Sequence, residues 1–298
     1  MLRATEEEDP SMTYRYGVFT VMLPELTPET AGVELKRHGY EGIEWRVTDA
    51  PAGTVEIPGY WSGNRCTLDI RRLDAELPRV RGICESNGLR VPALGTYLAA
   101  RDAGSVRRCM EFALALDCPQ IRVGVPGYDG SRPYGELYDE GLRDWETVAS
   151  LAEETGVRAN VELHMGNICP SAGLAHRFVS RFDPKHVGVV YDPGNMVVEG
   201  YERWQMGMEL LGPYLAHIHA KNTEWRYGAE RGGTVRFQPH WTAIQEGIVP
   251  WDEVYTALDR VGYRGWICFE DFSEIPWERK LRDNLAYLKG WERKPGNV

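Results

Sequence analysis

The sequence predicts a single (β/α)8 barrel, also called a TIM barrel, in which eight parallel strands are each followed by a helix. Short apolar runs alternate with amphipathic stretches eight times along the chain. Repeated strand–helix units imply parallel strands with right-handed crossovers, and eight units close a barrel of typically about 250 residues. An open sheet is disfavoured because the first predicted strand is not followed by a Gly-x-Gly-x-x-Gly turn.

Each predicted strand is a run rich in Val, Ile, Leu or aromatic residues, as expected for strands buried on both faces. The strands are residues 16–22, 42–47, 90–95, 120–125, 158–163, 187–191, 215–219 and 266–269. The predicted helices are 27–38, 68–87, 105–116, 142–155, 174–182, 202–211, 251–261 and 277–288. Pro28 suits a first helical position, and Gly88 suits the residue after a helix end.

We expect one domain, residues 16–298, preceded by a poorly ordered acidic extension of residues 1–15. Two long connections, residues 48–67 and 221–250, follow the second and seventh predicted strands as loops. In such a barrel, the connections after strands lie at the mouth where active sites form. We therefore expect both loops to be functional.

Composition excludes several classes of protein. The chain is 43% hydrophobic and 26% charged, which excludes a disordered chain. Its net charge of −10 argues against a nucleic-acid partner, since phosphate contacts need clustered Lys and Arg. No apolar run approaches the ~20 residues of a membrane span. The first ten residues do not resemble a signal peptide, and the six cysteines form no C-x-x-C pair. We expect a cytoplasmic protein with reduced thiols and a small sugar-like substrate.

Metal-competent side chains end the last four predicted strands: Glu162, Asp192, His219 and Glu270. Any one of them could serve only to cap a helix or hold a hydrogen bond. Four such side chains at the ends of consecutive strands indicate a metal site instead, because burying three carboxylates together is costly without a cation. Their oxygen and imidazole ligands suit one divalent ion, with Mn²⁺ preferred and Mg²⁺, Co²⁺ or Zn²⁺ as alternatives.

Two neighbours of these positions leave alternatives open. Alternation along the strand is taken to place His217 and His219 on opposite faces, and His219 is assigned to the interior. His164, just after the fifth strand, could act as a base, contact substrate, or hold Glu162 in place. Lys221 could stabilise an oxyanion or pair with a carboxylate.

Further candidates for substrate binding lie at other strand ends and in the two long connections. Glu44 and Arg46 could clamp substrate or form an ion pair, and Trp61 could stack on a sugar face. His240 could complete the site, although the connection that carries it could equally form an oligomer contact. Asn195 follows Asp192 by three residues.

Four segments carry a resemblance to a known family: VELHMGN, GVVYDPGN, HIHAKN and GYRGWICFED. They resemble the sugar phosphate isomerase/epimerase superfamily, whose members have the xylose isomerase-like TIM barrel. The resemblance extends over nearly the whole chain from about residue 16 and is strongest from Arg158 onward. It implies that Glu162, Asp192, His219 and Glu270 bind one divalent metal ion.

The resemblance also has departures. In ketose 3-epimerases of this superfamily, a His that touches substrate lies three residues after the Asp, where this chain has Asn195. Those enzymes place an Arg six residues after the metal-binding His, where this chain has Trp225. The signature at residues 219–222 and the long insert after it look more like the inosose dehydratase branch.

A bound divalent ion that chelates a ketone oxygen and the neighbouring hydroxyl stabilises the enediolate formed when a C–H proton leaves. Glu162 and Glu270 can then remove and return the proton, while His164 assists. This chemistry predicts an isomerase or epimerase of carbohydrate metabolism acting on a sugar, keto-sugar or polyol derivative. The alternative is a lyase, either an inosose-type dehydratase or a C-glycoside deglycosidase catalytic subunit. A homo-oligomer or an accessory subunit is compatible with either activity.

Overall fold

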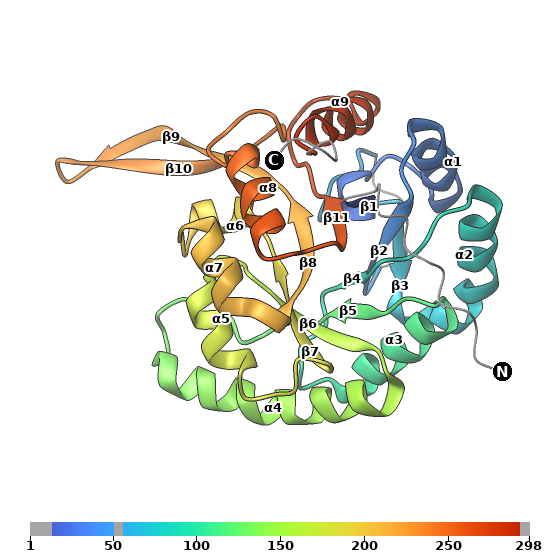
Figure 1. Ribbon diagram of the computed structural model, residues 1–298, viewed down its shortest axis with the longest axis horizontal. Helices are drawn as coiled ribbons and strands as arrows, with labels where there is room; N and C mark the ends of the chain where they lie inside the picture. Colours follow the sequence, from blue (N-terminus) through green and yellow to red (C-terminus); the bar gives the residue numbers. More distant parts are fainter. Residues whose placement is uncertain (1–13, 51–55, 293–298) are drawn as a thin grey trace.

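The protein is a closed ring of eight parallel strands surrounded by helices, seen in a computed structural model that describes residues 14–50 and 56–292 (Figure 1). Pairing of β1 with both β2 and β11 closes the ring, which confirms the predicted (β/α)8 fold. The barrel strands are β1 (Arg15–Phe19), β2 (Gly42–Thr48), β4 (Leu94–Thr96), β5 (Gln120–Arg122), β6 (Arg158–Glu162), β7 (Val187–Tyr191), β8 (Leu215–Ala220) and β11 (Trp266–Phe269). A short strand, β3 (Thr67–Asp69), pairs with β2 outside the ring.

Helices on the outside of the ring follow the barrel strands in the chain. They are α1 (Pro28–His38), α2 (Leu73–Asn87), α3 (Ala103–Ala115), α4 (Tyr134–Thr155), α5 (Ala172–Val179), α6 (Pro193–Val198), α7 (Trp204–Leu211), α8 (Trp251–Arg260) and α9 (Trp277–Lys289). Single 3-10 turns occur at Thr20–Met22, Ile70–Arg72 and Gly212–Tyr214. The start of α1 follows the predicted chemistry: the Thr27 hydroxyl accepts from the Thr30 amide, and Pro28 occupies the first turn.

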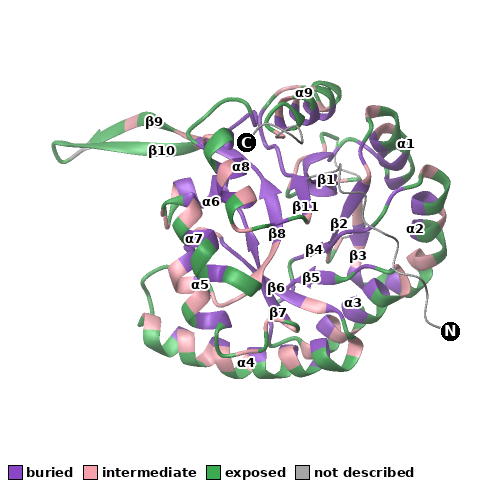
Figure 2. Ribbon diagram, viewed as in Figure 1, coloured by how far each residue is buried: buried purple, intermediate pink, exposed green. Residues whose placement is uncertain are grey.

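The barrel strands are almost entirely buried, while the outward faces of the helices are exposed (Figure 2). Trp45, Trp145 and Trp251 are the largest fully buried side chains and fill space between the elements. All six cysteines are buried free thiols. Within the described residues, no helix is both long and apolar enough to cross a membrane.

Several predicted boundaries need correction. The connection 221–250 was expected to be a loop, but it contains an antiparallel hairpin of β9 (Asn222–Arg231) and β10 (Thr234–Thr242). The hairpin turns at Gly232 and Gly233, whose φ angles of 62° and 74° suit the two-residue Gly-Gly turn. Helix α4 begins at Tyr134 rather than at residue 142. Residues 1–13 of the expected extension and 51–55 of the other connection lie outside the described residues.

Candidate functional site

Four buried side chains from four neighbouring strands converge at the carboxyl end of the barrel. They are Glu162, Asp192, His219 and Glu270, called here the four-residue cluster. One potential ligand atom from each lies within 4.8 Å of those from the others. His219 Nδ1 is 3.1 Å from Glu162 Oε1, 3.9 Å from Asp192 Oδ2 and 4.0 Å from Glu270 Oε2. The structure therefore gathers the four positions that the strand-end pattern singled out.

The donor atoms of the cluster fit a divalent cation. Three carboxylates and one imidazole supply oxygen and nitrogen ligands of the kind that Mn²⁺, Co²⁺ and Zn²⁺ accept. Two cations of the chain already face these carboxylates. Lys221 Nζ lies 2.9 Å from Asp192 Oδ2 and forms an ion pair with Glu270, while Arg122 Nη1 lies 2.5 Å from Glu162 Oε2. The carboxylates of the cluster therefore attract positively charged groups.

The electrostatic environment separates the two glutamates. Burial disfavours an ionised Glu162, but the Arg122 guanidinium and His219 outweigh it and hold the pKa of Glu162 well below its ordinary value. Burial raises the pKa of Glu270 to about 7, and the nearby Glu162 and Asp192 act in the same direction against Lys221 and His219. Burial lowers the pKa of His219, yet Glu44 and Glu162 together raise it well above its ordinary value.

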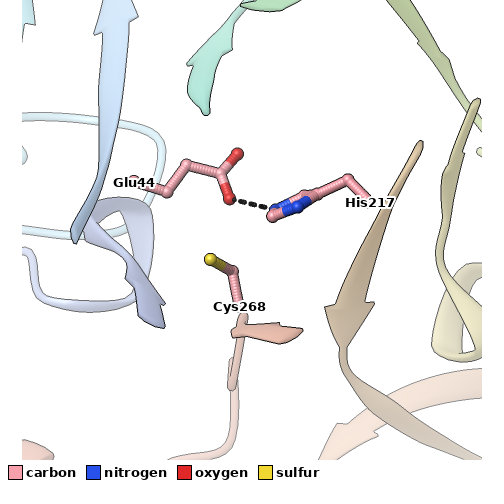
Figure 3. Close-up of side chains that lie close together, drawn as sticks. All are labelled: Glu44, His217 and Cys268. Atoms are coloured by element: carbon pink, nitrogen blue, oxygen red, sulfur yellow. Dashed lines mark hydrogen bonds and ion pairs between the residues drawn. The ribbon is translucent and has the colours of Figure 1, made fainter. Parts of the chain in front are cut away.

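A second buried group consists of Glu44, His217 and Cys268 (Figure 3), and its Glu44 contacts His219. His217 Nε2 is 2.9 Å from Glu44 Oε2, and His219 Nε2 is 3.2 Å from each Glu44 oxygen. The expectation that His217 and His219 lie on opposite strand faces is therefore wrong. Residues two apart in a strand point to the same face, so both rings lie inside the barrel.

A pocket of about 620 Å³ opens above the four-residue cluster. Its inner end is charged, with Glu162, Glu270, Lys221 and Arg122 among the lining residues. The lining also includes the aromatic rings of Trp61, Tyr97, Trp241 and Phe272, of which Trp61 and Tyr97 are exposed at the surface. The ring of Phe272 lies 4.9 Å from Trp61 and 5.9 Å from Trp241 between centroids. Such a pocket offers polar contacts at depth and flat apolar faces near the surface.

Besides Glu162 and Glu270, three of the predicted substrate or catalytic residues line this pocket: His164, Lys221 and Trp61. His164 is half-buried, and its Nδ1 lies 2.7 Å from the carbonyl oxygen of Met165. Trp61 is 57% exposed, so a flat ligand has access to its face. Lys221 Nζ sits 5.2 Å from the centre of the Trp241 ring, between the charged and aromatic parts.

Four other predicted contacts lie elsewhere. Glu44 is buried behind His219 with no face open to the pocket, which corrects the substrate contact expected for it. Arg46 does not pair with Glu44: its Nη1 donates to Thr67 Oγ1, and its guanidinium lies over the Tyr97 ring. Asn195 donates to Asp192 and accepts from Lys221, so it orders the cluster from behind. His240 lies on β10 outside the pocket lining.

Tyr97 and Phe272 are pocket residues that the sequence analysis missed. Each follows closely after a barrel strand, β4 for Tyr97 and β11 for Phe272. The signal was therefore the same strand-end position that singled out the carboxylates. It was overlooked because an aromatic residue next to a strand is more commonly a core residue.

Comparison with known proteins identifies the family. A family model described as the xylose isomerase-like TIM barrel matches residues 33–291. The chain belongs to this family. Among curated relatives, inosose dehydratase 2 of Bacillus cereus is 26% identical over 143 residues, which are 43% of this chain. That match spans 47% of the length of the relative, or about half.

Solved structures share the fold over almost the whole chain. The 3-keto-D-glucoside 4-epimerase of E. coli has a TM-score of 0.69 and 15% identity, and the alignment covers 93% of this chain and 99% of that one. IOLI protein, solved with a binding zinc atom, has a TM-score of 0.67 and 16% identity, with 93% and 96% covered. At these identities the similarity concerns the fold.

Proposed function

We propose that this protein is a divalent-metal-dependent enzyme that removes a proton next to the carbonyl of a keto-sugar or polyol derivative. The observation that carries the proposal is the convergence of Glu162, Asp192, His219 and Glu270, of which Glu162 and Glu270 line the pocket. A cluster of three buried carboxylates is the ligand set expected for such an ion. Proteins of the same fold include one solved with bound zinc and one that epimerises a 3-keto-glucoside.

When bound, a divalent cation would supply Lewis-acid stabilisation of the negative charge that develops on the substrate oxygen. The chain supplies the remaining chemistry. Glu162 and Glu270 come from β6 and from the end of β11, and both line the pocket, so one can accept the proton while the other returns it. Lys221 presents an ammonium group beside them, where it can hold a substrate hydroxyl or oxyanion.

The preferred proposal is an isomerase or epimerase, in which the proton returns to the same substrate molecule. Loss of a β-substituent after the same first step would make the enzyme a lyase. That second candidate is favoured by the inosose dehydratase relatives and by the Lys221 ammonium, which can donate a proton to a departing hydroxyl.

The experiment incubates the protein with Mn²⁺ and a panel of keto-sugars and ketoinositols in D₂O and follows the products by NMR. Deuterium in an isomeric sugar supports isomerisation or epimerisation, whereas loss of water or of an aglycone supports the lyase. Glu162→Gln and Glu270→Gln should each abolish exchange. Glu153→Gln, on the exposed surface of α4, is the matched control and should exchange normally. Full activity in both cluster variants would contradict the proposal.

A further inference from the structure

Glu44 is a buried carboxylate to which the proposed chemistry gives no task. It is 1% exposed, it lies in the middle of β2, and its two oxygens face the imidazoles of His217 and His219. A buried carboxylate is costly unless hydrogen-bond donors surround it. Here the donors are the His217 and His219 rings. The Cys268 thiol lies beside Glu44 and His217 (Figure 3). The arrangement holds an anion at a fixed point behind the cluster.

The position of the Glu44 carboxylate determines which nitrogen of the His219 ring faces the four-residue cluster. The ring nitrogen Nε2 of His219 faces Glu44, while Nδ1 faces Glu162 and the rest of the cluster. A histidine that binds a metal ion through one nitrogen usually donates the proton of the other to a carboxylate or carbonyl, which fixes its tautomer and orientation. The Phe19 ring stacks on the His219 ring, with 5.5 Å between the two centroids, and so restricts rotation of the imidazole about its bond to Cβ.

We propose that Glu44 is a positioning residue that holds His219 with a proton on Nε2 and the Nδ1 lone pair directed at the metal ion. This inference rests on the proposed function, because it concerns the same metal site. Glu44 would act only through His219, without touching metal or substrate. His217 and Cys268 would complete the hydrogen bonds that a buried carboxylate needs.

The test compares Mn²⁺ affinity of the full chain and of Glu44→Gln by EPR titration. A glutamine keeps the shape but removes the negative charge. Because His219 Nε2 lies 3.2 Å from each Glu44 oxygen, either orientation of the amide places its NH2 group beside that nitrogen. We expect Mn²⁺ binding about 10- to 100-fold weaker, the range for loss of such a partner. Glu44→Asp keeps the carboxylate, so it should recover part of the affinity, and it replaces the glutamine variant if that one does not fold.

Cys268→Ser is the matched control, because the serine hydroxyl keeps a donor at this position and both imidazole contacts to Glu44 remain. Its affinity should stay within a factor of a few of the wild type. Unchanged Mn²⁺ affinity in folded Glu44→Gln would overturn the positioning role while leaving the proposed function intact. A wild-type chain that binds no divalent ion would instead overturn the proposed function and the positioning role together.

The hairpin of β9 and β10, called here the arm, carries an independent inference. It forms its own two-stranded sheet and projects away from the barrel (Figure 1). Its register pairs Trp225 with Pro239 and Tyr227 with Phe237. Because residues two apart share a face, these four side chains lie together on one side of the arm. The positions between them are polar: Glu224, Arg226, Gln238 and His240.

Such alternation is typical of a strand with one buried face. In the single chain the outer part of the apolar face lies open, while Trp225 nearer the barrel donates through Nε1 to the carbonyl oxygen of Val197. Tyr227 is 67% exposed, Phe237 56% and Trp225 39%. An isolated two-stranded hairpin is marginally stable in water, so a partner that covers this face would also stabilise the arm. We infer that the partner is a second copy of this chain.

Charge and area both favour a second copy. The arm holds three Arg and two Glu, a net +1, which leaves −11 for the rest of a chain whose total is −10. An acidic barrel therefore complements the arm better than the arm complements itself. The exposed parts of the three aromatic rings amount to about 300 Å². Two arms and the surfaces they cover reach about 1,200 Å², the lower bound for a stable interface.

Sedimentation of the full chain at micromolar concentration tests the inference. We expect a dimer for the wild type, a monomer for the double variant Tyr227→Ser/Phe237→Ser, and a dimer for Gln238→Ser on the polar face of the arm. Circular dichroism establishes that each variant is folded. A monomeric wild type, or a double variant that remains dimeric, would overturn the inference.

Discussion

The buried ion pair between Arg122 and Glu162 gives the sharpest stability prediction. Arg122 is 8% exposed, its Nε donates to the Thr96 carbonyl oxygen at 2.9 Å, and its guanidinium lies over the Tyr97 ring. Replacing Arg122 with Met keeps much of the side-chain volume but removes the cation nearest to buried Glu162, which then keeps its contact with His219. Removing one partner of a buried pair typically costs about 3–5 kcal/mol, because the remaining charge is uncompensated.

The chain provides a matched control for this change. Arg107 makes two contacts of 2.7 Å with Glu154, but the pair lies on the exposed surface of α3 and α4. Solvent screens such a pair, so Arg107→Met should leave the unfolding midpoint almost unchanged. Both variants are compared with the wild type by urea unfolding in the presence of EDTA. The reasoning fails if Arg122→Met unfolds at the same urea concentration as Arg107→Met.

Three further predictions concern ligands of the pocket. Mn²⁺ at 100 times its Kd should stabilise the wild type by about 2.7 kcal/mol. The stabilisation is measured as a rise in Tm that EDTA reverses, and the Asp192→Asn variant should lose most of this rise. Trp61→Ala should raise the KM of the substrate several-fold while changing kcat less, because its ring lies at the outer end of the pocket. His240→Ala should leave both kcat and KM nearly unchanged, and a large loss would place β10 in the site.

The strand-end rule explains how much of the site the sequence could predict. The carboxyl ends of parallel barrel strands meet at one rim, so Glu162, Asp192 and Glu270 could be grouped from their spacing alone. His219 followed from the same rule once its strand was placed. The rule identifies positions rather than chemistry, and Tyr97 and Phe272 satisfied it without being noticed. The fold was predictable for the same reason, since eight repeated units leave few topologies open.

The parts that sequence could not predict depend on distance across the barrel. Glu44 and His217 are 173 residues apart in sequence, and only the closed ring brings their side chains to 2.9 Å. The hairpin of β9 and β10 could have been predicted, because a Gly-Gly pair separates two alternating segments. Strand-length segments inside a connection are easily taken for loop, because the strands of the barrel itself are already accounted for by the eight buried apolar runs.

The position of the arm connects its conformation with the chemistry of the pocket. Strand β9 begins at Asn222, directly after Lys221, and β10 contains Trp241 near its end, so the arm both starts and finishes at pocket residues. Asn222 is buried and donates to the carbonyl oxygens of Ile244 and Val249, which fixes the base of the arm. Lys221 is already held by Asp192 and Glu270, so a partner that orders the outer part of the arm would act on Trp241, which lies on β10 itself. On this argument the oligomeric state and the KM of the substrate should change together when the apolar face of the arm is removed, even though Tyr227 and Phe237 lie outside the pocket lining.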